Sequence, residues 1–294
     1  MLSYRHAFHA GNHADILKHI SLMLTLESMC KKEKPFTAID CNAGGGFYYL
    51  DSDAALKTGE AQEGILKLLS NVSDGKEQSN SDCGNNDSCS RQGECQNPIE
   101  RYIALVKPYL ELGIYPGSPE IIRSFLREQD KAILIELHNT EIEILKSHIN
   151  DNRISIQHRN CYEGLNAITP PQIRRGFLLM DPSYEVVSDY ENVASSLVSA
   201  QKKWNVGVQL LWYPLLRHRE GELQMMLDSI TAAAERNGLE WFTQEFVPTP
   251  STLEASSTQS DGYGLYGSGM LFVNPPWKLQ ENLSFAVEKL KTLL

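Results

Sequence analysis

The sequence predicts an α/β protein whose sheet is mostly parallel and doubly wound. Short apolar runs of strand length alternate with segments of helical periodicity, which is the pattern of repeated strand–helix–strand units. The runs at 239–247 and 268–277 instead follow each other with only a loop between them, which predicts an antiparallel pair at the C-terminal edge of the sheet.

Each predicted element rests on the spacing of its apolar residues. Residues 13–33 carry a broad apolar face at helical spacing, and they form the first predicted helix. The predicted parallel strands are 35–40, 131–138, 153–160, 176–184 and 205–214. Further helices are expected at 60–70, 98–113, within 115–130, and at 139–149, 188–204 and 219–237.

Residues 71–98 differ from the rest of the chain, because Asn, Ser, Asp and Gly dominate and there is little to bury. This composition is typical of a flexible surface loop. A structureless loop of this length is unusual inside a compact domain, so it is expected to decorate an insertion. We therefore expect one main domain at 1–50 and 110–294, with 51–109 as a small inserted helical subdomain that carries the loop.

The overall charge of −10 gives no basic field that would indicate nucleic-acid binding. Contacts with phosphates would have to come from local clusters, of which the candidates are Lys31-Lys32 with Lys34, Arg174-Arg175 and Arg217-His218-Arg219. The chain starts without a signal peptide and contains no apolar run of membrane-spanning length, so a cytoplasmic protein with free thiols is expected.

No metal site is expected from the cysteines or the histidines. Cys83, Cys89 and Cys95 recur every six residues but lack the C-x-x-C spacing of zinc sites. The histidine-rich start is interrupted by Gly11-Asn12, and no zinc-protease pattern is present.

A glycine turn follows the first strand, which ends at Asp40. Gly44, Gly45 and Gly46 would let a ligand approach the backbone at the carboxyl end of this strand. The dinucleotide fingerprint G-x-G-x-x-G fails here because its third glycine position holds Tyr49. The remaining pattern, a strand-ending aspartate followed by glycines, is also compatible with binding S-adenosylmethionine, which has no phosphates. The alternative is an ordinary tight turn.

Polar residues follow the next two strands. Glu136 lies near the end of the second strand and could accept hydrogen bonds from both hydroxyls of a ribose, or could be a solvated or capping glutamate. Asn160 follows the third strand and could contact the edge of an adenine, although asparagine is also common in turns.

The fourth strand ends in Asp181-Pro182-Ser183-Tyr184, a candidate site for methylating an amine. The lone pair of adenine N6 is delocalised into the ring, so a catalyst should accept hydrogen bonds from the amino group and take its proton. The Asp181 carboxylate and the Pro182 carbonyl would be the acceptors, and Tyr184 would stack on an extruded base. The alternative is a proline turn that closes a buried strand.

A second tetrad, Asn274 to Trp277, matches the general pattern of N6-methylases better letter by letter. Its position argues against it, because Asn274 ends the last strand, at the predicted edge of the sheet. Asp181 is therefore preferred.

The first residues combine aromatic, basic and histidine side chains. Such side chains suit contact with RNA phosphates and unstacked bases, and the segment contains Tyr4, Arg5, Lys18, His6, His9, His13 and His19. Solvated helix ends are the alternative.

Taken together, these residues resemble the bacterial 23S rRNA adenine-N6 methyltransferases of the J type, formerly described as proteins linked to the use of external DNA. The resemblance spans nearly the whole chain, and it is most specific in "MLSYRHAFHAGNHADILKH", "YPGSP", "REQD", "LWYP" and "NPPWKL". It implies a Rossmann-like class I methyltransferase domain with a helical insertion, S-adenosylmethionine as methyl donor, and 23S rRNA, free or in an early large-subunit precursor, as substrate. A monomer is expected.

The resemblance also assigns residues by position. The cofactor would be lined by His19, Asn42, Gly44, Gly46, Ser118, Glu136 and Asn160. Asp181, Pro182 and Tyr184 would carry the chemistry, and Tyr4, His6 and Lys18 would lie beside the RNA. The chain departs from the family pattern at Asn42 (usually His), Asn160 (usually Asp) and Ser183 (usually Pro).

Two other functions remain open from the sequence. One is a nucleic-acid-binding protein without catalysis that serves the uptake or use of DNA, and the three departures favour it. The other is a DNA adenine-N6 methyltransferase, because no residue identifies a 2′-hydroxyl.

Overall fold

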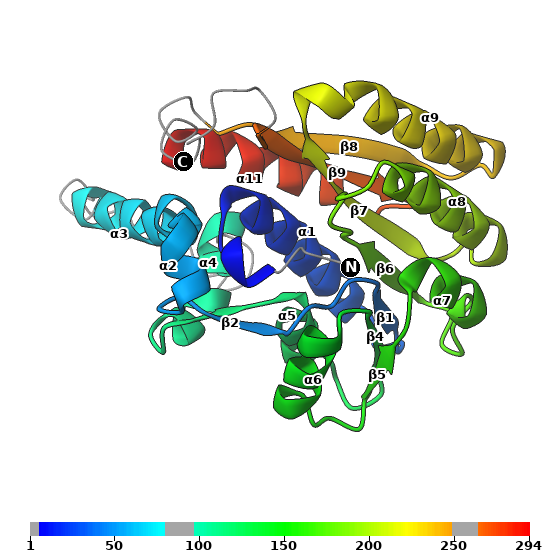
Figure 1. The fold of residues 1–294 in the computed structure, drawn as a ribbon, viewed down its shortest axis with the longest axis horizontal. Coiled ribbons are helices and arrows are strands. Elements are labelled where there is room, and N and C mark those ends of the chain that lie inside the picture. The colour runs from blue at the N-terminus through cyan, green and yellow to red at the C-terminus, as the bar shows by residue number, and fades with distance from the viewer. Residues whose placement is uncertain (1–5, 80–96, 249–263) are drawn as a thin grey trace, which may run out of the picture.

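The computed structural model describes residues 6–79, 97–248 and 264–294. Its centre is a seven-stranded sheet with the order β5-β4-β1-β6-β7-β9-β8 (Figure 1). The strands are β1 (Thr37–Asp40), β4 (Lys131–Glu136), β5 (Ile154–His158), β6 (Gly176–Met180), β7 (Val208–Leu215), β8 (Trp241–Phe246) and β9 (Gly267–Val273).

The pairing of the strands confirms the predicted Rossmann-like class I methyltransferase fold. Five neighbouring strands of this sheet are parallel, namely β5, β4, β1, β6 and β7. The order of the strands reverses beside β1, as in doubly wound sheets. The C-terminal strand β9 is antiparallel, as expected, and pairs with both β7 and β8. Strand β9 is the second strand from this edge of the sheet, and β8 is the edge strand.

Helices cover both faces of the sheet (Figure 1). One face carries α1 (His13–Cys30), α5 (Ser118–Phe125), α6 (Asn139–His148) and α11 (Leu279–Leu293), and the other carries α7 (Cys161–Ile168), α8 (Ser188–Lys203) and α9 (Glu220–Arg236). The sheet separates two apolar cores, and each central strand contributes to both because successive side chains point to opposite faces. This explains why β6 is buried along its whole length.

Helix α1 is buried on nearly all sides, which exceeds the broad apolar face that the sequence predicts. It packs against the sheet, α5, α11 and the inserted helices. The polar side chains of Asp15, Lys18 and His19 are therefore buried with it. Buried charges of this kind need partners, and those partners are found at the site described below.

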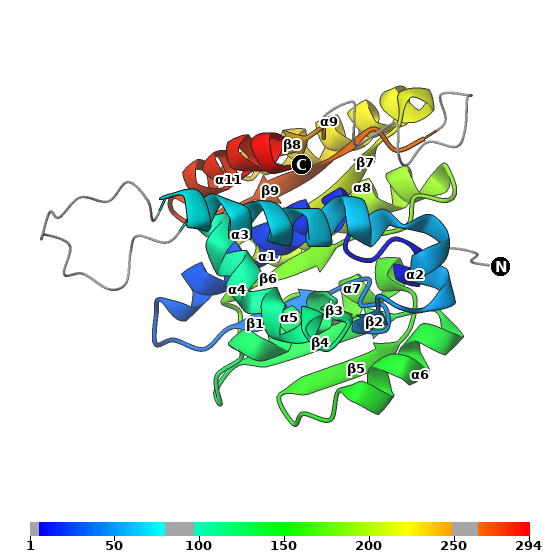
Figure 2. The ribbon, with the colours of Figure 1, turned by 90° about the vertical axis from the view of Figure 1, so that its left-hand side faces the viewer.

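The segment expected to be an insertion forms α2 (Asp53–Thr58), a π-helix (Gln62–Leu66), α3 (Lys67–Ser79) and α4 (Pro98–Leu110). Helix α3 occupies the start of the predicted 71–98 loop, and residues 80–96 of that loop lie outside the described ranges, together with Cys83, Cys89 and Cys95. Figure 2 shows α3 and α4 in front of α1. Ile65, Leu68, Ile99 and Tyr102 belong to the same core as α1 and α11.

The strands β1, β4 and β6 run in the same direction, so the residues that follow them meet at one edge of the sheet. The basic residues Lys34 and Arg175 lie at the opposite edge, where Arg175 donates to the Lys34 carbonyl at 2.7 Å just before β1 and β6 begin. Within the described ranges, no helix combines the length and apolarity that crossing a membrane requires.

Candidate functional site

A cavity of about 150 Å³ opens at the carboxyl edge of the sheet. Most residues that the sequence predicts for the site line it: His6, Lys18, Asn42, Gly44, Ser118, Glu136, Asn160, Asp181 and Pro182. Their elements are far apart in sequence, and the shared direction of the parallel strands brings them together.

Glu136 and the glycine turn form one wall of the cavity. Glu136 Oε2 accepts a hydrogen bond from the Gly44 N–H at 2.7 Å, and Oε1 accepts one from the His138 N–H at 2.6 Å. A carboxylate oxygen has more than one lone pair, so both oxygens can still accept from a ligand hydroxyl. Gly44 has a φ of +61°, and a Cβ there would lie 2.2 Å from Tyr48 Oη. The turn therefore requires glycine at position 44.

Gly46 shapes the turn but does not line the cavity. Its φ is +82°, and its carbonyl accepts from the Gly117 N–H at 2.7 Å. This bond continues the pairing of the small sheet formed by β2 (Phe47–Tyr49) and β3 (Ile114–Pro116). It fixes the start of α5, where Ser118 faces the cavity.

Two asparagines hold strand ends in place. Asn42 Oδ1 accepts from the Asp181 N–H at 3.2 Å, and this bond ties the end of β1 to the start of the tetrad. Asn160 Oδ1 accepts from the Tyr162 N–H at 2.9 Å and so caps α7. Capping, the alternative role of an asparagine in a turn, is thus present at a residue that also lines the cavity.

Asp40 is fully buried behind this wall. Burial raises the pKa of its carboxyl to about 6, although hydrogen bonds from the Ser118 hydroxyl and the Asn42 N–H act in the opposite direction. Within the described part of the chain, Asp40 Oδ2 has no hydrogen-bond partner.

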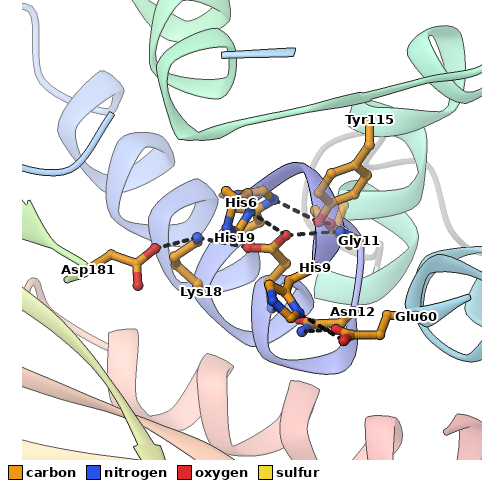
Figure 3. Close-up of polar contacts among 11 residues, drawn as sticks. His6, His9, Gly11, Asn12, Lys18, His19, Glu60, Tyr115 and Asp181 are labelled. Atoms are coloured by element: carbon orange, nitrogen blue, oxygen red, sulfur yellow. Dashed lines mark hydrogen bonds and ion pairs between the residues drawn. The ribbon is translucent and has the colours of Figure 1, made fainter. Parts of the chain in front are cut away.

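Lys18 joins two carboxylates on the other wall (Figure 3). Its Nζ lies 2.5 Å from Asp181 Oδ2 and 2.7 Å from Asp15 Oδ1. Burial disfavours the charged amine, but the two carboxylates outweigh burial and raise the pKa of Lys18. Lys18 is therefore an ammonium ion near neutral pH, and it fixes one oxygen of Asp181.

Asp15 also holds His6, since Asp15 Oδ2 lies 2.9 Å from His6 Nε2. Burial would raise the pKa of Asp15, but the nearby charges of His6 and Lys18 lower it well below its usual value. The carboxylate is therefore ionised and orders Lys18, which contacts Asp181, and His6, which lines the same cavity.

The family model described as "Ribosomal RNA large subunit methyltransferase D, RlmJ" matches residues 89–294. The protein named ribosomal RNA large subunit methyltransferase J of Escherichia coli is 36% identical over 288 residues, which cover 97% of this chain and 91% of the relative.

The Haemophilus influenzae protein of the same name is 35% identical and covers 96% of this chain and 90% of its own. The chain belongs to the ribosomal RNA large subunit methyltransferase J family. The crystal structure of protein LPL1258 from Legionella pneumophila has a TM-score of 0.76 at 26% identity and covers 97% of this chain and 94% of that one.

Tyr184 of this family member does not supply the stacking face that the sequence predicts. Its φ of +53° directs the ring away from the cavity and into the core, where it lies 4.8 Å from the ring of Tyr190. The Tyr184 hydroxyl donates to the Trp212 carbonyl at 3.0 Å, and the side chain is buried.

His19 is likewise absent from the cavity wall. Successive residues of a helix point about 100° apart, so His19 faces away from the neighbouring Lys18 and toward β3. Its Nδ1 is 2.8 Å from the Tyr115 hydroxyl, and its ring stacks on that of Tyr115. In the described ranges, His19 Nε2 is buried without a hydrogen-bond partner.

Two further predicted positions are Tyr4 and Asn274 of the second tetrad. Tyr4 lies outside the described residues. Asn274 follows β9, which runs antiparallel, and its side chain donates to the carbonyl of Gly207, just before β7 begins. The second tetrad therefore lies at the opposite edge of the sheet. No group of three or more metal-ligating side chains occurs among the described residues.

Sequence reasoning missed Tyr162 and Asp189, which also line the cavity. The Tyr162 hydroxyl donates to Asp189 Oδ1 at 3.1 Å. Tyr162 stands two positions after Asn160, so a search for aromatic residues near strand ends would have found it. Asp189 lies in the first turn of α8, where no pattern distinguishes it from a helix-favouring acidic residue.

Proposed function

We propose that this protein is an S-adenosylmethionine-dependent methyltransferase that modifies adenine N6 in 23S rRNA. The observation that carries the proposal is that Asp181, held by Lys18 and Asn42, lines the same cavity as Glu136 and Gly44. Membership of a family of ribosomal RNA methyltransferases favours this activity over non-catalytic binding and over DNA as substrate.

The residues of the cavity fit the proposed cofactor. Glu136 offers acceptors for ribose hydroxyls, and Gly44 lines the cavity beside it. When bound, S-adenosylmethionine would supply an electrophilic methyl group.

The chemistry required of the protein is to activate the target amine. Lys18 holds Asp181 Oδ2, and Oδ1 and the Pro182 carbonyl can accept hydrogen bonds from the N6 amino group. These bonds favour a nitrogen with an available lone pair and give its proton an acceptor. Aromatic contacts with the base would come from Tyr162 or His6, which line the cavity, in place of Tyr184.

The remaining parts of the proposal concern the substrate and the domains. The adenine must leave its stack to reach the cavity, which suits rRNA that is free or in an early large-subunit precursor. We expect a cytoplasmic monomer, with residues 1–50 and 110–294 as the catalytic domain and 51–109 as the insertion.

The substitution Asp181→Asn tests the proposal because it keeps the shape of the side chain and removes its charge. We expect methyl transfer from labelled S-adenosylmethionine to unmodified 23S rRNA fragments to fall at least about 100-fold. Cofactor affinity, measured by isothermal titration, should stay within about tenfold because Glu136 and Gly44 are untouched.

Asn274→Ala is the matched control, since it alters the other tetrad and should leave transfer within about twofold. Undiminished transfer in Asp181→Asn would place the chemistry elsewhere. Absence of cofactor binding by the wild type at millimolar concentration would refute an enzyme of this class, and equal transfer to DNA of the same sequence would refute RNA specificity.

A further inference from the structure

The inserted segment is bonded to the N-terminal segment at side chains that neither the fold nor the cavity requires. Glu60 follows α2 and accepts two hydrogen bonds, with His9 Nδ1 2.8 Å from its Oε1 and Asn12 Nδ2 2.8 Å from its Oε2. The Thr58 hydroxyl donates to the Phe8 carbonyl at 2.5 Å. Residues 8–12 are thereby bonded to a part of the chain about fifty positions away.

The backbones of the two segments are in direct contact. The Ile65 N–H donates to the Gly11 carbonyl at 2.9 Å, inside the kinked π-helix. A Cβ at Gly64 would lie 2.1 Å from that carbonyl oxygen, so only glycine permits this approach. Gly11 itself has a φ of +80°, which also favours glycine.

From this contact, hydrogen bonds lead without interruption to Asp181 (Figure 3). Asn12 Oδ1 accepts from the Asp15 N–H at 2.9 Å, and the Gly11 N–H donates to Asp15 Oδ2 at 2.9 Å. Asp15 then contacts Lys18, which contacts Asp181. Each hydrogen bond or ion pair in this path joins residues that are wholly or mostly buried.

The middle of this path is its most deeply buried part, since the side chain of Asp181 at the cavity end is 15% exposed. The side chain of Glu60 is 23% exposed, whereas those of Asp15 and Lys18 are 2% and 6% exposed. Buried groups of opposite charge keep their geometry only while each has its partner, because an unpaired buried charge is costly. The position of Asp15 thus depends on the segment 9–12 that Glu60 holds.

We propose that Glu60 is a positioning residue for the methyl-transfer site, acting through residues 9–12 and Asp15 on His6, Lys18 and Asp181. The inserted helices then have a catalytic task besides packing, namely to fix the N-terminal segment beside the cavity. The proposal rests on the proposed function for its catalytic part and on the described contacts for its structural part.

Hydrogen exchange and kinetics of Glu60 variants test both parts. In Glu60→Ala, the backbone amides of residues 9–12 should exchange at least about tenfold faster than in the wild type, because local opening no longer breaks two hydrogen bonds. The kcat for transfer to 23S rRNA fragments should fall about tenfold through misplacement of Lys18 and Asp181. Glu60→Gln keeps one acceptor oxygen and should give intermediate values.

Cofactor binding separates positioning from loss of folded protein. Titration with S-adenosylmethionine should still give one site per chain, with the dissociation constant within about threefold of the wild type, because the Glu136 wall is distant in the network. Glu63→Ala is the matched control, since Glu63 lies on the same insertion with a 44% exposed side chain and should change neither exchange nor kcat.

Unchanged exchange of residues 9–12 in Glu60→Ala would overturn the proposal. Faster exchange with an unchanged kcat would also overturn it, because the segment would then be held without effect on transfer. An inactive wild type would instead refute the proposed function, and the exchange data would still decide whether Glu60 holds the segment.

Discussion

At the scale of single residues, Asp15 and Asp40 show how the surroundings of a buried carboxyl decide its charge. Both are buried beside the cavity, and burial alone would raise both pKa values. Asp15 contacts Lys18 and His6, whose charges lower its pKa. Asp40 has only neutral hydrogen-bond donors as direct partners, and its pKa stays raised at about 6.

The raised pKa of Asp40 predicts a pH-dependent stability. Between its usual pKa of 3.8 and about 6, the folded protein keeps a proton on Asp40 that the unfolded chain releases, so the Asp40 contribution to the free energy of unfolding falls as pH rises. Asp40→Asn should therefore gain stability relative to the wild type between pH 4 and 7, by up to about 3 kcal/mol.

Urea unfolding of both proteins at several pH values measures this difference. Comparing the two proteins cancels the contributions of other titrating groups. A difference that stays constant from acid to neutral pH would show that Asp40 has the same pKa in the folded and the unfolded chain.

At the scale of elements, the turn after β1 and the strand β2 are fitted to each other. Tyr48 Oη occupies the space that a Cβ of Gly44 would need, and the next ring atom lies 3.6 Å away, at ordinary contact distance. The glycine is thus required by a side chain as well as by its positive φ.

Gly44→Ala should weaken S-adenosylmethionine binding at least about tenfold, because the turn must shift against Glu136. Adding Tyr48→Phe removes the clashing oxygen and should restore part of the affinity, while the cost of a positive φ, about 1 kcal/mol, remains. Isothermal titration of the two single variants and the double variant measures this. A double variant no better than Gly44→Ala would show that the backbone alone sets the requirement.

The sequence predicted elements well where their pattern was apolar. The parallel strands were found because both faces are buried, which produces continuous apolar runs such as Phe177 to Met180. Helix α3 was missed beyond residue 70 because Asn, Ser, Asp and Gly dominate the sequence that follows. Tyr184 and His19 were misplaced, since the direction of a side chain depends on one backbone torsion or on helical phase, which spacing in the sequence does not give.

At the scale of the whole molecule, the helices between β2 and β3 share one core with the seven-stranded sheet. Leu68 is fully buried within the same cluster as α1 and α11. Leu68→Ala should lower the free energy of unfolding by about 2–5 kcal/mol in a single cooperative transition. Urea unfolding followed by tryptophan fluorescence and by circular dichroism should give coincident curves, and a separate early transition would show that the insertion folds independently.

The sequence by itself determined the alternation of strands and helices, the polar residues at strand ends and the resemblance to a family. These features are local, because a strand end, a glycine turn or a motif is written in consecutive residues. The tertiary structure decided which ends meet, for the direction of a strand is not a local property: β9 runs antiparallel, so Asn274 lies away from Asp181. It also decided that Lys18 lies between Asp15 and Asp181 and that Glu60 reaches Asn12, because only packing brings charges from distant segments into contact.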